Sequence, residues 1–333
     1  MARRTFPWII GVILLGVSFV TIALGLFVFR PRSQVYGVTF SRQYAADLGV
    51  DWREAYTATL RDFSPEVIRI PVVWTDIEPA DGTFYFDELD WMMAQAKAYD
   101  ARVVLAIGLK VPRWPECHIP AWVERDDEQA LKQSVLTMEQ RVVLRYRDHA
   151  SLVRWQVENE PLFWYGECPL PNLERLREEV ELVRDLDVAH PVVLTSSGEQ
   201  ATWFELSSLA DVIGVSLYRF AWNPALGPVV FPHAPWYYRI HSGLVSLVSG
   251  DPVIISELQM EPWYEDGLGN DEGDHIAFTK DDFDEHIAFV QQTNVSEVWL
   301  WGVEWWYREY LAGRTEIWDA ARELFDDNAY ATD

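Results

Sequence analysis

Short apolar runs alternate with longer amphipathic stretches along most of the chain. Eight runs have the length and β-branched content of buried strands, and they cover residues 35–40, 67–71, 103–107, 153–157, 192–195, 212–216, 253–256 and 298–301. Helical patterns separate them, at residues 87–99, 126–147, 172–188 and 279–292. Asn172 and Thr279 are N-capping residue types at the start of two of these patterns.

An alternation of strand and helix repeated eight times predicts a single (β/α)8 barrel, the TIM barrel of the α/β class. We expect it to cover residues 35–326, with a short tail at 327–333. The competing fold is a doubly wound open sheet, which would place a glycine-rich phosphate turn after the first strand. Residues 37–43 read Gly-Val-Thr-Phe-Ser-Arg-Gln and contain no such turn.

The first 34 residues predict a membrane anchor. Residues 8–29 carry no charge and are flanked by arginines on both sides, and a helix of this length spans a bilayer. A cleaved signal peptide would have a shorter apolar region ending in small residues, whereas this one ends Phe-Val-Phe at 27–29. We therefore expect residues 1–34 to form a cytoplasmic stub, an uncleaved transmembrane helix and a short linker.

Charge and cysteine content bear on the partners and the cellular location of the protein. The chain has 52 acidic and 27 basic residues, a net charge of -25, which argues against a nucleic-acid partner. We expect a monomer in the cell membrane, single-pass, with the acidic barrel on the extracytoplasmic side. The two cysteines, Cys117 and Cys168, could form one disulfide or remain two free thiols.

Two glutamates follow predicted strands at the end where barrels hold their chemistry. The fourth run leads into Trp-Gln-Val-Glu-Asn-Glu-Pro at 155–161, and the seventh leads into Glu257. Strands four and seven lie across the mouth of an eight-stranded barrel from each other, so their carboxylates could flank one bond of a substrate. Glycosidic cleavage needs such a pair, one as proton donor and one facing the anomeric carbon.

These residues resemble the clan A glycoside hydrolases, retaining (β/α)8 enzymes that include cellulases, mannanases, xylanases and β-galactosidases. Asn159-Glu160-Pro161 is the most specific element of the resemblance, together with Glu257 after the seventh strand. The resemblance implies that Glu160 is the general acid/base. It also implies that Glu257 is the nucleophile and forms a covalent glycosyl-enzyme intermediate.

The same resemblance implies roles for three more residues. Arg69 is a charged residue inside an apolar run, and the family has an arginine beside the nucleophile; the alternative is a bridge between barrel layers to another carboxylate. Tyr218 would hydrogen-bond the nucleophile, and Asn159 would contact the sugar 2-hydroxyl. The sequence departs from the family at Ser216 and at Gly-Leu-Lys 108–110, where many relatives have histidine.

Seventeen tryptophans are present, and many follow predicted strands. Indole rings stack on the apolar faces of sugars, so we expect Trp74 and Trp263 to contact substrate. For any one of them, packing between loops is the competing interpretation. Trp301 ends the eighth strand on the same face as Trp299, and it matches the tryptophan that forms the floor under the cleaved sugar in the family.

The sequence therefore predicts a retaining glycoside hydrolase that cleaves β-linked oligo- or polysaccharide without a cofactor. One alternative is a catalytically inactive barrel that binds glycans at the cell surface. Another is a transglycosylase that passes the sugar to a hydroxyl group instead of water. The sugar, the linkage and the choice between endo and exo action are not specified by these residues.

Overall fold

The computed structural model describes Gly25 and residues 33–223, 227–264 and 275–329. Apart from Gly25, the predicted transmembrane helix lies outside these residues. Among the helices that the structure describes, none is long and apolar enough to cross a membrane.

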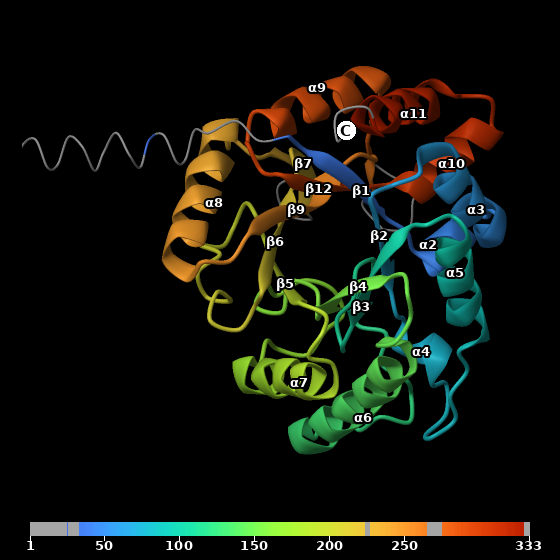
Figure 1. Ribbon diagram of the computed structural model, residues 1–333, viewed down its shortest axis with the longest axis vertical. Coiled ribbons are helices and arrows are strands. Elements are labelled where there is room, and N and C mark those ends of the chain that lie inside the picture. Colours follow the sequence, from blue (N-terminus) through green and yellow to red (C-terminus); the bar gives the residue numbers. More distant parts are fainter. Residues whose placement is uncertain (1–24, 26–32, 224–226, 265–274, 330–333) are drawn as a thin grey trace, which may run out of the picture.

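The described residues form a closed barrel of parallel strands (Figure 1). Its strands, in chain order, are β1 (Val35–Thr39), β2 (Val67–Pro71), β3 (Arg102–Ile107), β4 (Leu152–Val157), β5 (Val192–Ser196), β6 (Val212–Leu217), β9 (Val253–Gln259) and β12 (Glu297–Trp301). The order around the barrel is β1-β12-β9-β6-β5-β4-β3-β2. The predicted single (β/α)8 barrel is confirmed. The seventh strand is longer than predicted, because it continues from residue 256 to Gln259.

Helices surround the barrel (Figure 1). They are α2 (Arg42–Asp47), α3 (Trp52–Phe63), α4 (Trp74–Ile77), α5 (Asp87–Ala98), α6 (Glu128–Tyr146), α7 (Leu173–Leu186), α8 (Pro235–Ser249), α9 (Lys280–Gln291), α10 (Val303–Leu311) and α11 (Glu316–Ala329). Asn172 caps α7 as predicted, and Thr279 forms a capping box with Asp282 at the start of α9. Helix α11 continues past residue 326, the expected limit of the barrel domain.

The apolar core has two layers. One fills the barrel interior, and its buried members are Val67, Val104, Val193, Val212, Ile254 and Trp299. The other, much larger layer lies between the strands and the helices. Residues on a strand alternate between the two layers, so side chains near the carboxyl ends of the strands can reach the barrel mouth above the packed interior.

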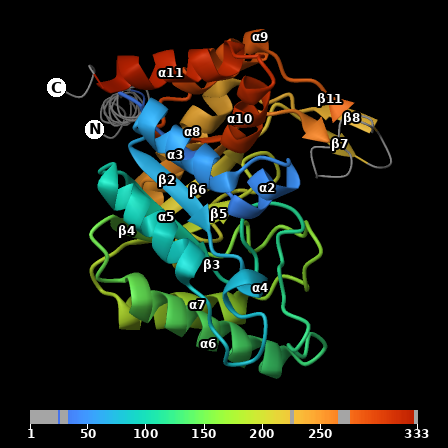
Figure 2. The ribbon, with the colours of Figure 1, turned by 90° about the vertical axis from the view of Figure 1, so that its right-hand side faces the viewer.

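Two small antiparallel hairpins extend from the barrel (Figure 2). One pairs β7 (Phe220–Asn223) with β8 (Gly227–Val230), and the other pairs β10 (Trp263–Tyr264) with β11 (His275–Ile276). They follow β6 and β9 directly and contact each other. The sequence pattern did not predict either hairpin, although both form a wall of the mouth.

Candidate active site

A β-bulge directs Glu257 into the barrel mouth. Ile254 points into the barrel interior and Ile255 into the outer layer, so regular alternation would send the side chain of residue 257 outward. The pairing with β6 shifts at this point, because Val215 pairs with Ile255 whereas Ser216 pairs with Glu257. Ser256 is therefore an extra residue in β9, and it restores Glu257 to the inward face.

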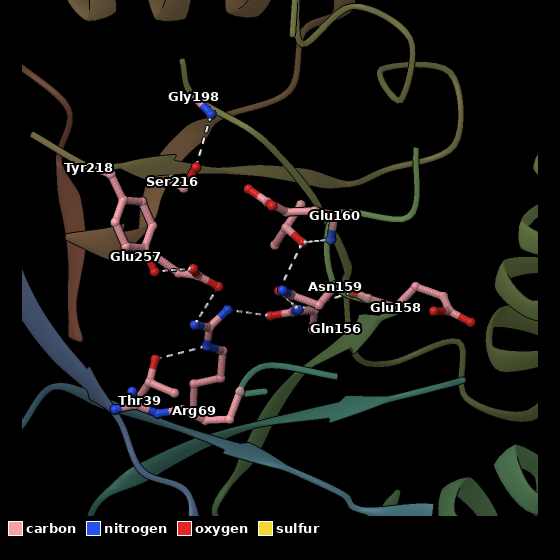
Figure 3. Close-up of polar contacts among 12 residues, drawn as sticks. Thr39, Arg69, Gln156, Glu158, Asn159, Glu160, Gly198, Ser216, Tyr218 and Glu257 are labelled. Carbon is pink, nitrogen blue, oxygen red and sulfur yellow. Dashed lines mark hydrogen bonds and ion pairs between the residues drawn. The ribbon is translucent and has the colours of Figure 1, made fainter. Parts of the chain in front are cut away.

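Both oxygens of the Glu257 carboxylate are held by donors (Figure 3). Arg69 Nη2 donates to Oε1 at 3.0 Å, and the Tyr218 hydroxyl donates to Oε2 at 3.0 Å. Arg69 is fully buried and also donates to Thr39 Oγ1 at 2.9 Å and to Gln156 Oε1 at 3.1 Å. The structure thus places Arg69 beside Glu257, where its charge stabilises an ionised carboxylate.

Asn159 and Glu160 occupy a tight turn at the end of β4. Glu160 has a φ of 43°, a left-handed conformation that is uncommon for residues other than glycine. Its backbone N–H donates to Thr195 Oγ1 at 2.8 Å, and Gln156 Nε2 donates to Asn159 Oδ1 at 3.1 Å. These bonds fix the turn, and the Glu160 side chain extends toward the same side of the mouth as Glu257 (Figure 3).

The loop after β3 supports this turn from below. Glu158 accepts hydrogen bonds from the backbone N–H groups of Leu109 and Lys110, at 2.9 and 2.7 Å. Its carboxylate lies so close to Gly108 that an added Cβ would sit 3.0 Å from Glu158 Cδ. Lys110 Nζ donates to the backbone carbonyl of Glu160 at 3.2 Å. Gly-Leu-Lys at 108–110, where the sequence lacks the histidine expected from the resemblance, therefore supports the turn that carries Glu160 through these hydrogen bonds.

The surroundings of Glu160 favour its neutral, protonated form. Burial raises its pKa well above the usual range for a glutamate, and repulsion from Glu257 and Glu116 raises it further. The ammonium of Lys110 acts in the opposite direction. A carboxyl group that keeps its proton at neutral pH can donate it to a substrate. The two glutamates thus lie in opposite environments, since Glu257 is bound by a cation.

Glu116 and Glu199 are among the carboxylates near the site that were missed in the sequence. Glu116, in the loop after β3, lies 3.0 Å from Lys110 Nζ, and burial raises its pKa to about 7. Glu199 accepts from the Tyr218 backbone N–H at 2.7 Å and from Ser216 Oγ at 3.1 Å, and burial raises its pKa to about 7. Glu199 follows the end of β5 by three residues. A search for carboxylates just after each predicted strand, which singled out Glu160, could therefore have included Glu199.

A cavity of about 700 Å³ opens above Glu257. Its lining includes three carboxylates, Glu116, Glu257 and Glu261, and the rings of Tyr44, Trp114, Trp164, Tyr165, Tyr218, Trp222, Trp263, Tyr264 and Trp301. Asn159 and Glu160 are 1% and 8% exposed and stand beside this cavity instead of lining it. Aromatic surfaces with convergent polar groups are typical of a small-molecule site.

Among the predicted tryptophans, Trp263 and Trp301 line the cavity and Trp74 does not. The Trp263 ring packs edge-on against Tyr218, with the centroids 5.4 Å apart. Trp74 is 1% exposed, and its indole N–H donates to Glu78 at 2.9 Å. Its ring packs edge-on against Trp122 in the loop after β3, with the centroids 6.0 Å apart, so Trp74 is buried away from the cavity and its contact with a sugar stays a prediction.

A disulfide joins Cys117 to Cys168, and no other cysteine is present in the chain. Of the two alternatives left open by the sequence, the structure has the disulfide. It connects the loop after β3 to the loop after β4, so the two loops that carry Glu116 and Glu160 are covalently tied. No group of three metal-ligating side chains occurs within the described ranges.

The comparisons with known proteins agree with this architecture. No protein-family profile and no curated protein matches the sequence. Similar solved structures include a β-galactosidase from Rahnella sp. R3 (13% identity, TM-score 0.61, 91% of this chain and 57% of that one). A second is a GH5_18 protein from Streptomyces cattleya in complex with GlcNAc (13% identity, TM-score 0.57, 81% of this chain and 71% of that one). A third is a GH10 endo-β-1,4-xylanase from Gloeophyllum trabeum (14% identity, TM-score 0.55, 82% of this chain and 85% of that one).

The chain spans a little more than half the length of the β-galactosidases it resembles, 57% for Rahnella and 54% for Marinomonas ef1. Identities of this size establish the fold alone. The chain has the single (β/α)8-barrel fold found in the clan A glycoside hydrolases.

Proposed function

We propose that the protein is a retaining glycoside hydrolase that acts on a β-linked oligo- or polysaccharide, with Glu257 as nucleophile and Glu160 as general acid/base. The proposal rests most on one observation. Glu257 is bound by Arg69 and Tyr218, whereas Glu160 is buried with a raised pKa. A nucleophile must be ionised and an acid must hold a proton, so these environments suit the two roles.

In the first step, Glu257 attacks the anomeric carbon while Glu160 gives its proton to the leaving oxygen. The glycosidic bond breaks, and a covalent ester forms between the sugar and Glu257. In the second step, Glu160, now a carboxylate, takes a proton from a water molecule that attacks the same carbon. Glu257 leaves, and the sugar is released with its original configuration.

The remaining residues suit the oxocarbenium-like transition state. Oδ1 of Asn159 already accepts a hydrogen bond from Gln156, so its amide N–H groups are oriented for a sugar hydroxyl. Trp301 offers a ring next to Glu257 as a floor for the sugar, and Trp263 lines the cavity beside Tyr218. A further support is that the proteins of similar fold include β-galactosidases and a xylanase in complex with xylotetraose.

A panel of 4-nitrophenyl β-glycosides tests the proposal. We expect release of nitrophenol from at least one β-glycoside, and proton NMR at early times should show the β-anomer of the free sugar. Initial appearance of the α-anomer would contradict double displacement. If neither the aryl glycosides nor β-linked oligosaccharides are cleaved, a barrel that only binds glycans would explain the structure better.

We expect Glu116→Gln to narrow the pH profile on its alkaline side. Activity requires the protonated form of Glu160, so kcat/KM is high below the pKa of Glu160 and is lost above it. The charge of Glu116 raises that pKa, so removing this charge should shift the alkaline limb of kcat/KM to lower pH by about half a unit or more.

The measurement is kcat/KM against pH with one aryl glycoside. Glu167→Gln, in the neighbouring loop after β4, is the matched control and should keep the wild-type limb. An alkaline limb that stays in place in Glu116→Gln, or moves to higher pH, would contradict the electrostatic role given to Glu116.

We also propose that residues 8–29 anchor the barrel in the cell membrane as a single-pass helix, with the barrel outside the cytoplasm. The charge-free run in the sequence and the Cys117–Cys168 disulfide support this, because disulfides persist in oxidising compartments. Protein from a native membrane fraction should react with a thiol-alkylating reagent only after reduction. Recovery in the soluble fraction, or labelling without reduction, would count against the proposal.

A further inference from the structure

A buried charged cluster crosses part of the barrel mouth. Its centre is Arg113, in the loop after β3, whose φ of 91° is unusual for a residue with a side chain. The guanidinium binds the carboxylate of Glu261 through both Nη atoms, and Nη2 donates to Glu304 Oε2 at 2.8 Å. Glu261 follows β9 and Glu304 lies in α10 after β12, so three loops meet at one cation.

The cluster also includes two aromatic rings. The Arg113 guanidinium lies 3.8 Å from the ring centroid of Tyr44 in α2, and 4.1 Å from that of Trp301. Glu304 in addition accepts a hydrogen bond from the backbone N–H of Ser41, the N-cap of α2. We call Tyr44, Arg113, Glu261, Trp301 and Glu304 the Arg113 cluster. It ties together the loops that follow β1, β3, β9 and β12.

The Arg113 cluster coincides with one limit of the central cavity. Four of its members, all except Glu304, line that cavity, and no described residue between 45 and 112 does so. A separate cavity of about 170 Å³ lies over α2, β2 and α4, and the two cavities share no lining residue. The residues that line the cavity above Glu257 are thus a separate set from those over the loop after β2.

This limit lies on the nucleophile side. Arg69, which binds Glu257, is 5.6 Å from the Trp301 ring, and Arg113 lies over the same ring. The sugar that Glu257 attacks must lie here, because its anomeric carbon has to face that carboxylate. The leaving group lies toward Glu160, and the loop after β4 adds the exposed ring of Trp164 on that side.

We propose that the Arg113 cluster closes the cavity behind the attacked sugar, so that the enzyme removes single terminal sugars from the non-reducing end of a β-linked chain. The inference rests on the proposed glycosidase function and specifies its substrate. A polysaccharide can be cut internally only in a groove that is open on both sides of the cleaved bond. A site that is closed on one side accepts only the end of a chain. Arg113 and Glu261 offer polar groups to the hydroxyls of that terminal sugar.

Pentasaccharides labelled with 2-aminobenzamide at the reducing end test this. The probes are β-linked oligomers of galactose, glucose, xylose, mannose and N-acetylglucosamine, incubated with the full chain and sampled at early times. We expect unlabelled monosaccharide together with labelled tetrasaccharide as the first products. Early labelled monosaccharide or disaccharide, with aryl glycosides still cleaved, would overturn this inference and leave the glycosidase function intact. Cleavage of no oligomer and no aryl glycoside would overturn both.

Tyr44→Ala tests whether the cluster causes the terminal action. It removes one ring over the guanidinium but leaves the three charges paired. We expect the ratio of internal to terminal cleavage to rise by about tenfold or more. Tyr85→Ala, at an exposed ring beside the separate cavity, is the matched control and should keep the wild-type ratio. An unchanged ratio in Tyr44→Ala with a wild-type circular dichroism spectrum would reject the cluster as the closing element.

Discussion

Glu257→Gln is expected to lower kcat on the best aryl glycoside by a factor on the order of 10⁴ or more. The amide has nearly the shape of the carboxylate but cannot attack the anomeric carbon, so no glycosyl-enzyme forms. Arg69 would also lose the anion that compensates its buried charge. The measurement is kcat and KM beside a thermal melt, because a folded but inactive protein separates loss of chemistry from loss of structure.

The variant Glu257→Ala tests the role of Glu257 through the stereochemistry of the product. The shortened side chain leaves room for sodium azide, which would attack the anomeric carbon from the side where Glu257 stood. We expect azide to restore turnover and to yield the α-glycosyl azide from a β-glycoside. A β-glycosyl azide would show that another group occupies the nucleophile's position.

Glu160→Gln is expected to give the second largest effect, one that depends on the leaving group. A sugar or alcohol needs a proton from Glu160 in order to leave, so kcat/KM for an unactivated β-glycoside should fall by about 10²- to 10⁴-fold. A 2,4-dinitrophenolate leaves without that proton, so kcat/KM for the dinitrophenyl glycoside should fall far less.

For the same dinitrophenyl substrate, KM should fall together with kcat, because the second step lacks its base and the glycosyl-enzyme accumulates. Both substrates are measured with the wild type and the variant at one pH. An equal loss of kcat/KM for the two leaving groups would indicate that Glu160 has a structural role. In that case the buried side chain of Glu160 would serve only to pack the turn after β4.

Much of the fold could be predicted from the sequence, because parallel barrel strands are buried on both faces and appear as continuous apolar runs. The end of β4 was placed by Asn159-Glu160-Pro161. Arg69 stood out because a charge inside an apolar run requires a specific partner. The structure gives that partner as Glu257.

The rest depends on backbone geometry that has no simple sequence signal. The bulge at Ser256 decides which way Glu257 points, and alternation alone would have placed that side chain outside the barrel. Arg113, which binds Glu261 after β9 and Glu304 in α10, has a left-handed backbone conformation that the sequence does not announce. Trp74 is buried and does not line the cavity, because a position after a strand does not determine whether a ring turns toward the mouth or into the core.

Covalent trapping tests the central claim most directly. The wild-type protein is incubated with the 2-deoxy-2-fluoro-β-glycosyl fluoride of whichever sugar it accepts, digested, and analysed by tandem mass spectrometry. The fluorine at C2 slows both the attachment and the release of the sugar, whereas the fluoride leaving group speeds only the attachment, so the intermediate should persist. We expect a single labelled peptide with the sugar esterified to Glu257. A sugar attached to Glu160, Glu116 or any other residue would contradict the assignment of the nucleophile and the mechanism built on it.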